Sequence, residues 1–310
     1  MIKHILRFAI LAGIAHGLLV FAEDDKVEFK KSVPLAPADH MILDVTVPKG
    51  DVSIQFRHAG EITVTASAST TDGKNLPDNF FETSLKVERE GNHLKVAAAP
   101  SALSAKPTVQ IAYQIGVPDW IEVNSVVENG NQTVAGVRGP VKVASGHGDI
   151  KILYVTTTLD AKTGSGNITV TRVGTAARVE TGAGNIKMND IGPSSSAIVK
   201  KGHGRIEMDG VSGSFTGSTD AGELVAQGAV FEDWNLTTIS GKISIAIGEG
   251  EGGAEPKFDV DAITKSGQFT SENEYLKPCR VGAVRECHQK VNGGGSVIRV
   301  RSQSGDIFIH

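Results

Sequence analysis

Residues 147–152, 165–170 and 183–188 read HGDIKI, SGNITV and AGNIKM, and this short pattern decides the fold. The pattern recurs along the C-terminal part of the chain, each time around one pivot glycine: Gly148, Gly166, Gly184, Gly204, Gly222, Gly241, Gly267 and Gly305. Successive pivots lie 18, 18, 20, 18, 19, 26 and 38 residues apart. A period near 20 residues is typical of repeat architectures, in which each repeat stacks on the next.

The residues around each pivot glycine fall into columns. Two and four residues after the glycine the chain is mostly apolar, and the residue between is mostly polar, as in Ile150, Lys151 and Ile152. This alternation predicts a strand with one buried face. A second strand is expected before the glycine, with an apolar residue such as Ala177 or Ala197 seven positions before it. Three positions before it stands a column of hydroxyls that one lysine interrupts: Ser145, Thr163, Thr181, Lys201, Thr219, Thr238, Thr264 and Ser302.

Stacked coils account for these columns, because adjacent coils lie about 4.8 Å apart and bring like residues over one another. We therefore predict an all-β chain in which residues 121–310 form a β-solenoid, single-stranded β-helix-like, with coils of 18–20 residues. The pivot glycines suit tight turns that need a positive φ or a close backbone approach. Insertions are expected at 248–256 and 272–295. Residues 23–120 are expected to form an irregular, sandwich-like β region that joins the solenoid without a linker.

The N-terminus is typical of a secretory signal peptide over residues 1–22. A basic stretch, Met1–Arg7, precedes an apolar run from Phe8 to Ala22, and acidic residues follow. The run is shorter than the ~20 residues of a membrane span. We predict cleavage after Ala22, export to the periplasm, the cell surface or the medium, and no membrane span in the mature protein.

Composition and cysteines narrow the possibilities further. The 310 residues include 36 Gly and only 5% aromatics, which favours many turns and short strands. The net charge of −4, with 31 basic and 35 acidic residues mixed along the chain, gives no footprint for binding nucleic acid. Cys279 and Cys287, eight residues apart, are expected to form a disulfide in an exported protein. A zinc site would need two further ligands, and only His288 is near.

Three motifs that suggest bound ions or cofactors have simpler interpretations. His147 and His203 share a column but lie three coils apart, about 14 Å, so they cannot hold one ion. Residues 248–253, GEGEGG, match a dinucleotide motif by letter, but no helical pattern follows and the two glutamates would repel phosphate. The column after the pivot glycine lacks the repeated Asp of a calcium-binding β-roll. It reads as a turn ladder: Asp149, Asn167, Asn185, Arg205, Glu223, Lys242, Gln268 and Asp306.

Carboxylates in adjacent coils leave an enzyme open as an alternative. Asp190, Asp209 and Glu223, with Asp220, Lys187 and Arg205 nearby, could line a groove. Glycoside hydrolysis needs two carboxylates at a defined separation. The simpler interpretation is a solvated face on which Lys187 neighbours Glu207.

The GxGxI strand repeats, the Val117-Pro118-Asp119-Trp120 segment before the first of them and the exported context resemble the bacterial putative-adhesin family. That family comprises exported β-strand-repeat proteins of unknown function, related to the head GIN domain of predicted autotransporter adhesins. The resemblance covers about residues 40–310 and implies a β-solenoid in the cell envelope. It brings no catalytic residues to carry over.

These observations predict a non-catalytic envelope or surface protein of adhesin type that binds or scaffolds an unidentified glycan or protein. No catalytic, cofactor-binding or metal-binding residue is predicted, and the ladders of Thr, Ser, Asn and Lys are the expected ligand surface. The alternatives are a β-helix polysaccharide lyase or glycosidase and an envelope sensor that acts through a protein partner. The last coil, ending Ile307–His310, is expected at an uncapped end, which permits end-to-end self-association.

Overall fold

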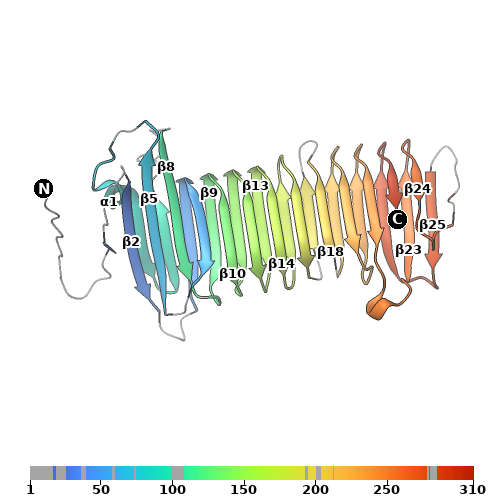
Figure 1. The fold of residues 1–310 in the computed structure, drawn as a ribbon, viewed down its shortest axis with the longest axis horizontal. Coiled ribbons are helices and arrows are strands. Elements are labelled where there is room, and N and C mark those ends of the chain that lie inside the picture. The colour runs from blue at the N-terminus through green and yellow to red at the C-terminus, as the bar shows by residue number, and fades with distance from the viewer. Residues whose placement is uncertain are drawn as a thin grey trace, which may run out of the picture.

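The protein is described by a computed structural model over residues 17–18, 26–35, 40–57, 60–72, 75–99, 108–192, 195–199, 204–211, 213–277, 279 and 285–310. Two long sheets run from one end of an elongated body to the other and enclose one core between them (Figure 1). Apart from the expected signal peptide's Gly17–Leu18, which pairs with the next strand, residues 1–22 lie outside the described range. Within that range no helix is long and apolar enough to cross a membrane.

Sheet I has 14 described strands, and its neighbours in space are, in order, β1 (Gly17–Leu18), β2 (Val27–Pro34), β5 (Glu61–Thr70), β8 (Val109–Val117), β4 (Asp51–Phe56), β10 (Gln132–Val137), β12 (Ile150–Val155), β14 (Ile168–Val173), β16 (Ile186–Ile191), β18 (Ile206–Val211), β20 (Leu224–Gly228), β22 (Ile243–Ile247), β27 (Ile307–Ile309) and β24 (Phe269–Ser271).

Sheet II has 13, in the order β25 (Arg285–Val291), β23 (Phe258–Thr264), β26 (Ser296–Ser302), β21 (Trp234–Thr238), β19 (Phe215–Thr219), β17 (Ser195–Val199), β15 (Ala177–Thr181), β13 (Leu159–Ser165), β11 (Val141–His147), β9 (Glu122–Asn129), β3 (Ile42–Lys49), β7 (His93–Ala98) and β6 (Leu85–Glu90). The short helix α1 (Phe80–Ser84) and the 3-10 turn η1 (Glu251–Gly253) are the other regular elements described.

The predicted solenoid is confirmed: successive coils each give one parallel strand to each sheet. Ile150, Ile168 and Ile186 stand directly opposite one another on β12, β14 and β16, and each is at most 1% exposed. The apolar columns from both sheets meet in one continuous core.

The pivot glycines hold the coils together at close range. Gly148, Gly166 and Gly184 have φ near +145°, and a Cβ on Gly166 would lie 2.1 Å from the carbonyl oxygen of Gly148. The hydroxyl three residues before a pivot donates to the carbonyl of the previous pivot, as Thr181 does to Gly166 over 3.0 Å. Coil spacing therefore depends on bare backbone at this column.

A second column of unusual backbone runs along the other end of the sheet I strands. Ala135 pairs with Leu153 and Val137 with Val155, so the residue between is left out of the ladder in each coil. This bulge column has left-handed φ values of 73°, 58°, 58°, 53° and 68° at Gly136, Tyr154, Arg172, Asp190 and Gly210.

The 20-residue coil differs from the expected alignment. Ser195, and not Ala197, stands opposite Ala177, and Val199 stands opposite Thr181 in the hydroxyl column. The two extra residues of this coil therefore come after strand β17 and before Gly204. Lys201 and His203 lie outside the described residues.

The N-terminal region shares both sheets with the solenoid. β3 and β4 form one more coil, parallel to β9 and β10. Beyond it, sheet I continues through β8 and then through the antiparallel strands β5 and β2, while sheet II continues through β7 and β6. Residues on either side of position 120 thus build one body.

The C-terminal coils are stacked in a different order from the chain. β27 lies between β22 and β24, and β26 lies between β21 and β23. The last coil is therefore inserted one layer inside, and the expectation that Ile307–His310 forms an uncapped end is wrong. The outermost elements are β24 and the antiparallel strand β25, which the 272–295 insertion supplies.

Candidate functional site

A polar groove of about 550 Å³ lies on the outer face of sheet I, over the N-terminal strands β2, β5, β8 and β4. Its walls carry mainly uncharged hydrogen-bonding side chains with a few charges: Lys30, Ser53, Gln55, Arg57, Glu61, Thr63, Thr65 and Gln114. Hydroxyls and amides on a sheet face can each donate and accept. The groove is therefore suited to a ligand rich in hydroxyl groups.

A glycine shapes the floor of the groove. A Cβ on Gly116 would lie 2.8 Å from Arg57 Cδ and 2.5 Å from Thr63 Oγ1. The aliphatic stem of Arg57 thus crosses β8 over Gly116, while the Arg57 backbone amide donates to Val117 O over 2.8 Å. The Arg57 side chain lines the groove, and its guanidinium brings a positive charge to it.

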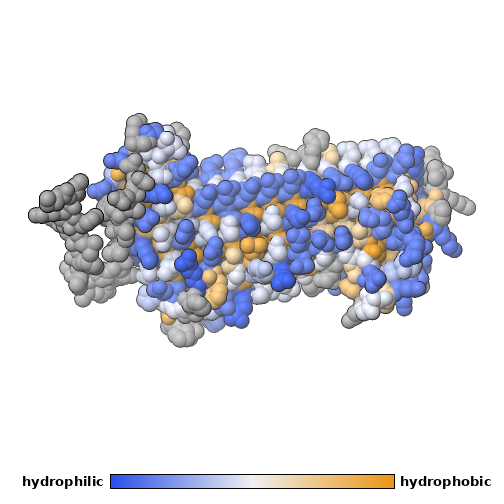
Figure 2. Space-filling model, viewed as in Figure 1, coloured by the Kyte–Doolittle hydropathy of each residue, from blue (hydrophilic) through white to orange (hydrophobic). Residues whose placement is uncertain are grey.

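One row of the groove continues onto the solenoid. Strand register places the following residues in line across sheet I: Lys30, Thr65, Gln114, Ser53, Thr133, Lys151, Thr169 and Lys187. Figure 2 shows hydrophilic residues along the whole length of the body on the face in view, with apolar residues between them. The outer face of sheet I is thus a polar surface that is hollowed at its N-terminal end.

The hydroxyl ladder expected as a ligand surface is instead part of the interior. Thr163, Thr181 and Thr264 are 4%, 0% and 0% exposed. Their hydroxyls donate to pivot-glycine carbonyls of the neighbouring coil at 3.0 Å. This column is buried because it has to satisfy those carbonyls.

The Asn and Asp turn ladder is exposed but its side-chain oxygens are occupied. Asp149 Oδ1 accepts from Asn167 N over 2.7 Å, and Asn167 Oδ1 accepts from Asn185 N over 2.9 Å. The same bond joins Asn185 to Arg205 at 2.8 Å. These side chains hold coil to coil, and ligand binding would compete with those bonds.

The carboxylates considered for catalysis lie on open surface. Arg205 Nη1 is 2.5 Å from Glu223 Oε2, and Arg172 Nε is 3.5 Å from Asp190 Oδ2. Asp209 is exposed on β18. Five well-formed grooves of the described surface are lined by residues between 26 and 140, and these three carboxylates line none of the five.

The expected pairing of Lys187 with Glu207 is present at 2.7 Å. The hydrogen bond from the Lys187 ammonium holds the pKa of the Glu207 carboxyl below its usual range. A lowered pKa keeps this carboxylate charged, which suits an ion-pair ladder and not a general acid.

The other motifs take structural positions. His147 Nδ1 lies 2.7 Å from Ser165 Oγ at the end of β11. Residues 248–253 form a loop that includes η1. Within the described residues no cluster of His, Cys, Asp or Glu could hold a metal ion.

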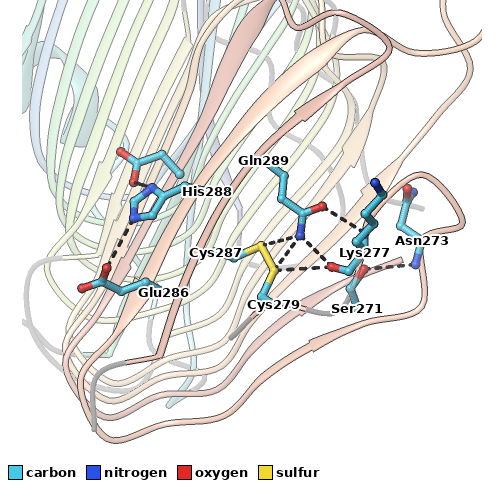
Figure 3. Close-up of a disulfide and its surroundings, with 9 residues drawn as sticks. Ser271, Asn273, Lys277, Cys279, Glu286, Cys287, His288 and Gln289 are labelled. Atoms are coloured by element: carbon cyan, nitrogen blue, oxygen red, sulfur yellow. Dashed lines mark hydrogen bonds and ion pairs between the residues drawn. A yellow bond between two sulfur atoms is a disulfide. The ribbon is translucent and has the colours of Figure 1, made fainter. Parts of the chain in front are cut away.

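Cys279 and Cys287 are joined by a disulfide that ties β25 to the preceding loop (Figure 3). Gln289, on the same strand, exchanges two hydrogen bonds with the Lys277 backbone, at 2.9 and 2.6 Å. The disulfide therefore fixes β25, the edge strand of sheet II at the C-terminal end of the body.

The groove was missed from the sequence because its residues come from four strands that were interpreted as ordinary. A usable signal was present: the outward positions of these strands carry small or uncharged polar side chains, as in Ser53 and Gln55 or Thr63 and Thr65. Their juxtaposition requires the strand order β5–β8–β4, which no local pattern specifies.

Comparison with known proteins identifies the family of this chain. Residues 42–310 match the Toastrack DUF4097 family. The chain belongs to this family. The Toastrack match covers the coil β3–β4 as well as the solenoid, in agreement with the sheets that they share. The chain has no match among curated proteins.

Solved structures similar to this Toastrack chain are distant. A putative adhesin from Bacteroides fragilis has 11% identity and a TM-score of 0.37, covering 91% of this chain and 97% of its own. A putative cell adhesion protein from Clostridium sporogenes has 9% identity and a TM-score of 0.25, and the match covers 90% of this chain and 97% of that protein. A putative lipid binding protein from Parabacteroides distasonis has 12% identity and a TM-score of 0.33, and the match covers 71% of this chain and 90% of that protein. Likenesses at this level carry no information about the ligand of this chain.

Proposed function

We propose that this protein is an exported, non-catalytic binding module of the cell envelope whose polar groove on β2, β5, β8 and β4 binds a glycan. The observation that carries the proposal is the lining of the groove: Gln114, Ser53, Thr63 and Thr65 present amides and hydroxyls beside the Arg57 guanidinium. Such groups match the hydroxyls of a sugar, and a site built to hydrogen-bond hydroxyls discriminates strongly against ligands that lack them.

Two features favour binding over cleavage. The carboxylates considered for hydrolysis lie away from the groove, and Glu61 is the acidic residue of its lining. Hydrolysis by a pair of carboxylates needs a second one across the scissile bond.

The test is retention of the purified protein on isolated cell-envelope polysaccharide and peptidoglycan, with soluble reducing ends assayed in the same tubes. We expect saturable retention without sugar release. Gln114→Ala should weaken retention about tenfold, since it removes hydrogen bonds to a polar ligand. Thr216→Ala, on the exposed face of β19 in sheet II, is the matched control and should leave retention unchanged.

Release of reducing ends would overturn the proposal in favour of a carbohydrate-active enzyme and direct attention to Asp190, Asp209 and Glu223. The proposal also fails if the protein is not retained on either material, and a sensor that acts through a protein partner would then be the better account. Retention that is equal in Gln114→Ala and in the unchanged protein would contradict the groove as the site.

A further inference from the structure

The bulge column begins beside the groove and carries strained residues with exposed side chains. Gln55 and Arg57 line the groove, and Phe56 between them is 43% exposed at the same end of β4. A Cβ on Gly136, the first position of the bulge column, would lie 2.9 Å from Phe56 Cβ. The groove and the bulge column therefore meet at the end of β4.

The next three bulge positions hold large side chains where glycine would be easiest. Tyr154, Arg172 and Asp190 have φ of 58°, 58° and 53° in three successive coils. A left-handed backbone costs a residue with a Cβ about 1–2 kcal/mol, and such strain concentrates at functional sites. The neighbours Gly136 and Gly210 show that the fold accepts glycine in this column.

The three side chains form a connected, solvent-facing stack. The Arg172 guanidinium lies 5.5 Å from the centre of the Tyr154 ring and 3.5 Å from Asp190 Oδ2. Tyr154 is 53% exposed, and the position on its other side is Gly136, which has no side chain. Arg172 therefore contacts the Tyr154 ring from one side, and on the other side the neighbouring bulge position, Gly136, has no side chain to cover the ring.

The spacing and the charge of this surface indicate the kind of ligand. Each coil advances by about 4.8 Å, which is close to the length of one hexose unit in a linear polysaccharide. In a chain whose net charge is −4, the groove, the row that continues from it and the bulge column hold the cations Lys30, Arg57, Lys151 and Arg172 against the carboxylates Glu61 and Asp190. An aromatic face beside cations is suited to sugar rings that bear carboxylates.

We propose that the groove is the first part of a longer track, and that a linear uronic-acid polysaccharide lies along the solenoid axis from β2 to β16 with a sugar stacked on Tyr154. This inference rests on the proposed glycan-binding function and adds the ligand's charge, its direction and a second contact region. The track crosses eight strands, about 34 Å, or roughly seven sugars.

The experiment measures dissociation constants of the full chain for galacturonate oligomers of two, four and seven sugars by calorimetry, with N-acetylglucosamine oligomers of equal length as neutral probes. We expect affinity for galacturonate to rise at least tenfold from two to seven sugars and to fall with added salt. The neutral oligomers should bind more weakly at every length.

Tyr154→Gly separates the track from the groove. It removes the ring and also relieves the left-handed strain, so the variant folds. It should weaken binding of the seven-sugar oligomer about tenfold and leave the two-sugar oligomer unchanged, because the shorter ligand fits within the groove. Phe231→Ala is the matched control, since Phe231 is an aromatic residue of similar exposure, 48%, outside the track.

Equal affinities for two and seven sugars, an unchanged affinity in Tyr154→Gly, or equal binding of neutral oligomers would each overturn the inference. In those cases retention on envelope polysaccharide that depends on Gln114 would still support the groove. If the groove variant and the unchanged protein behave alike in the retention test, the proposed function fails as well.

Discussion

At the scale of single residues, this protein is built on backbone positions where side chains are excluded or strained. The pivot glycines allow carbonyl and Cα atoms of successive coils to approach more closely than any Cβ permits. The bulge column has the same left-handed geometry at Gly136 and Gly210 but carries Tyr154, Arg172 and Asp190 between them. The first column therefore serves stability, and the second has side chains that stability alone does not require.

Gly166→Ala tests the pivot column. The added methyl group would lie 2.1 Å from Gly148 O on a backbone with φ of +145°. Overlap and strain together should lower the free energy of unfolding by about 3 kcal/mol or more. Gly91→Ala is the control, because Gly91 has φ of +62° and open space around it, so only strain of about 1 kcal/mol is expected. Urea unfolding of both variants measures these losses of stability. Equal losses of unfolding free energy in the two variants would contradict the proposed close approach at Gly166.

A pair of substitutions at Tyr154 tests the bulge column for strain. Both Tyr154→Gly and Tyr154→Val remove the ring and its contact with Arg172, but only glycine adopts a φ of 58° without cost. The valine variant should be less stable than the glycine variant by about 1–2 kcal/mol. Thermal unfolding of the two proteins under one buffer gives this difference, and equal stability would mean that position 154 is not strained.

At the scale of secondary-structure elements, each coil is closed by hydrogen bonds that pass between coils as well as along strands. The buried hydroxyl column satisfies the pivot carbonyls, and the turn ladder satisfies backbone amides at the same edge. Two residue types that look like a ligand-binding surface in the sequence are thus consumed by the fold. The groove residues project from the face of sheet I and not from its edge, and Gln55 Nε2 there donates to Ser53 Oγ over 3.0 Å.

Thr181→Val is the test of the buried hydroxyl column. Thr181 is 0% exposed and donates to Gly166 O over 3.0 Å, so valine would leave a buried carbonyl without its donor. The free energy of unfolding should fall by about 1–3 kcal/mol. Thr181→Ser should retain most of the stability, whereas Thr216→Val, on the exposed face of β19, should change it by less than about 0.5 kcal/mol. A neutral Thr181→Val would show that the hydrogen bond is not needed.

The sequence was informative where each coil repeats the last and uninformative where neighbours had to be chosen. The columns through Ile150, Ile168 and Ile186 predicted both the strands and their register, because identical coils can stack in only one way. The position of the two extra residues before Gly204 was predicted on the wrong side of β17, since sequence spacing does not distinguish a longer strand from a longer turn. The groove depends on antiparallel strands outside the repeat, so no period could reveal it.

At the scale of the whole molecule, the two sheets make one rod whose C-terminal end is assembled out of sequence order. The final coil, β26 and β27, enters between the β21–β22 coil and the β23–β24 layer (Figure 1). Every coil presents the same kind of edge, so local chemistry does not dictate which coil comes next. The edge strand β25 carries charged side chains, a common way of limiting edge-to-edge pairing. End-to-end self-association stays a prediction, and it would now involve β24 and β25.

A chain that ends at Gly295 tests the inserted coil. Ordinary truncation of a solenoid removes only its last layer. This one removes an inner layer, so that β24 loses β27 and β23 loses β26 and keeps only its antiparallel partner β25. We expect β23, β24 and β25 to lose hydrogen-exchange protection together, while β9 to β16 keep theirs. Protection that persists in β23 would contradict the stacking order.

The central claim, that sheet I binds an acidic glycan along its N-terminal half, is tested most directly by lysine footprinting. Acetylation of each lysine would be measured by mass spectrometry with and without polygalacturonate. The account predicts that Lys30 and Lys151 become protected, since they lie in one row of the binding surface. Lys86, exposed on β6 of sheet II, and Lys242, beyond the track, should react as before. Protection of Lys86 and Lys242 with unchanged reactivity at Lys30 and Lys151 would contradict the account.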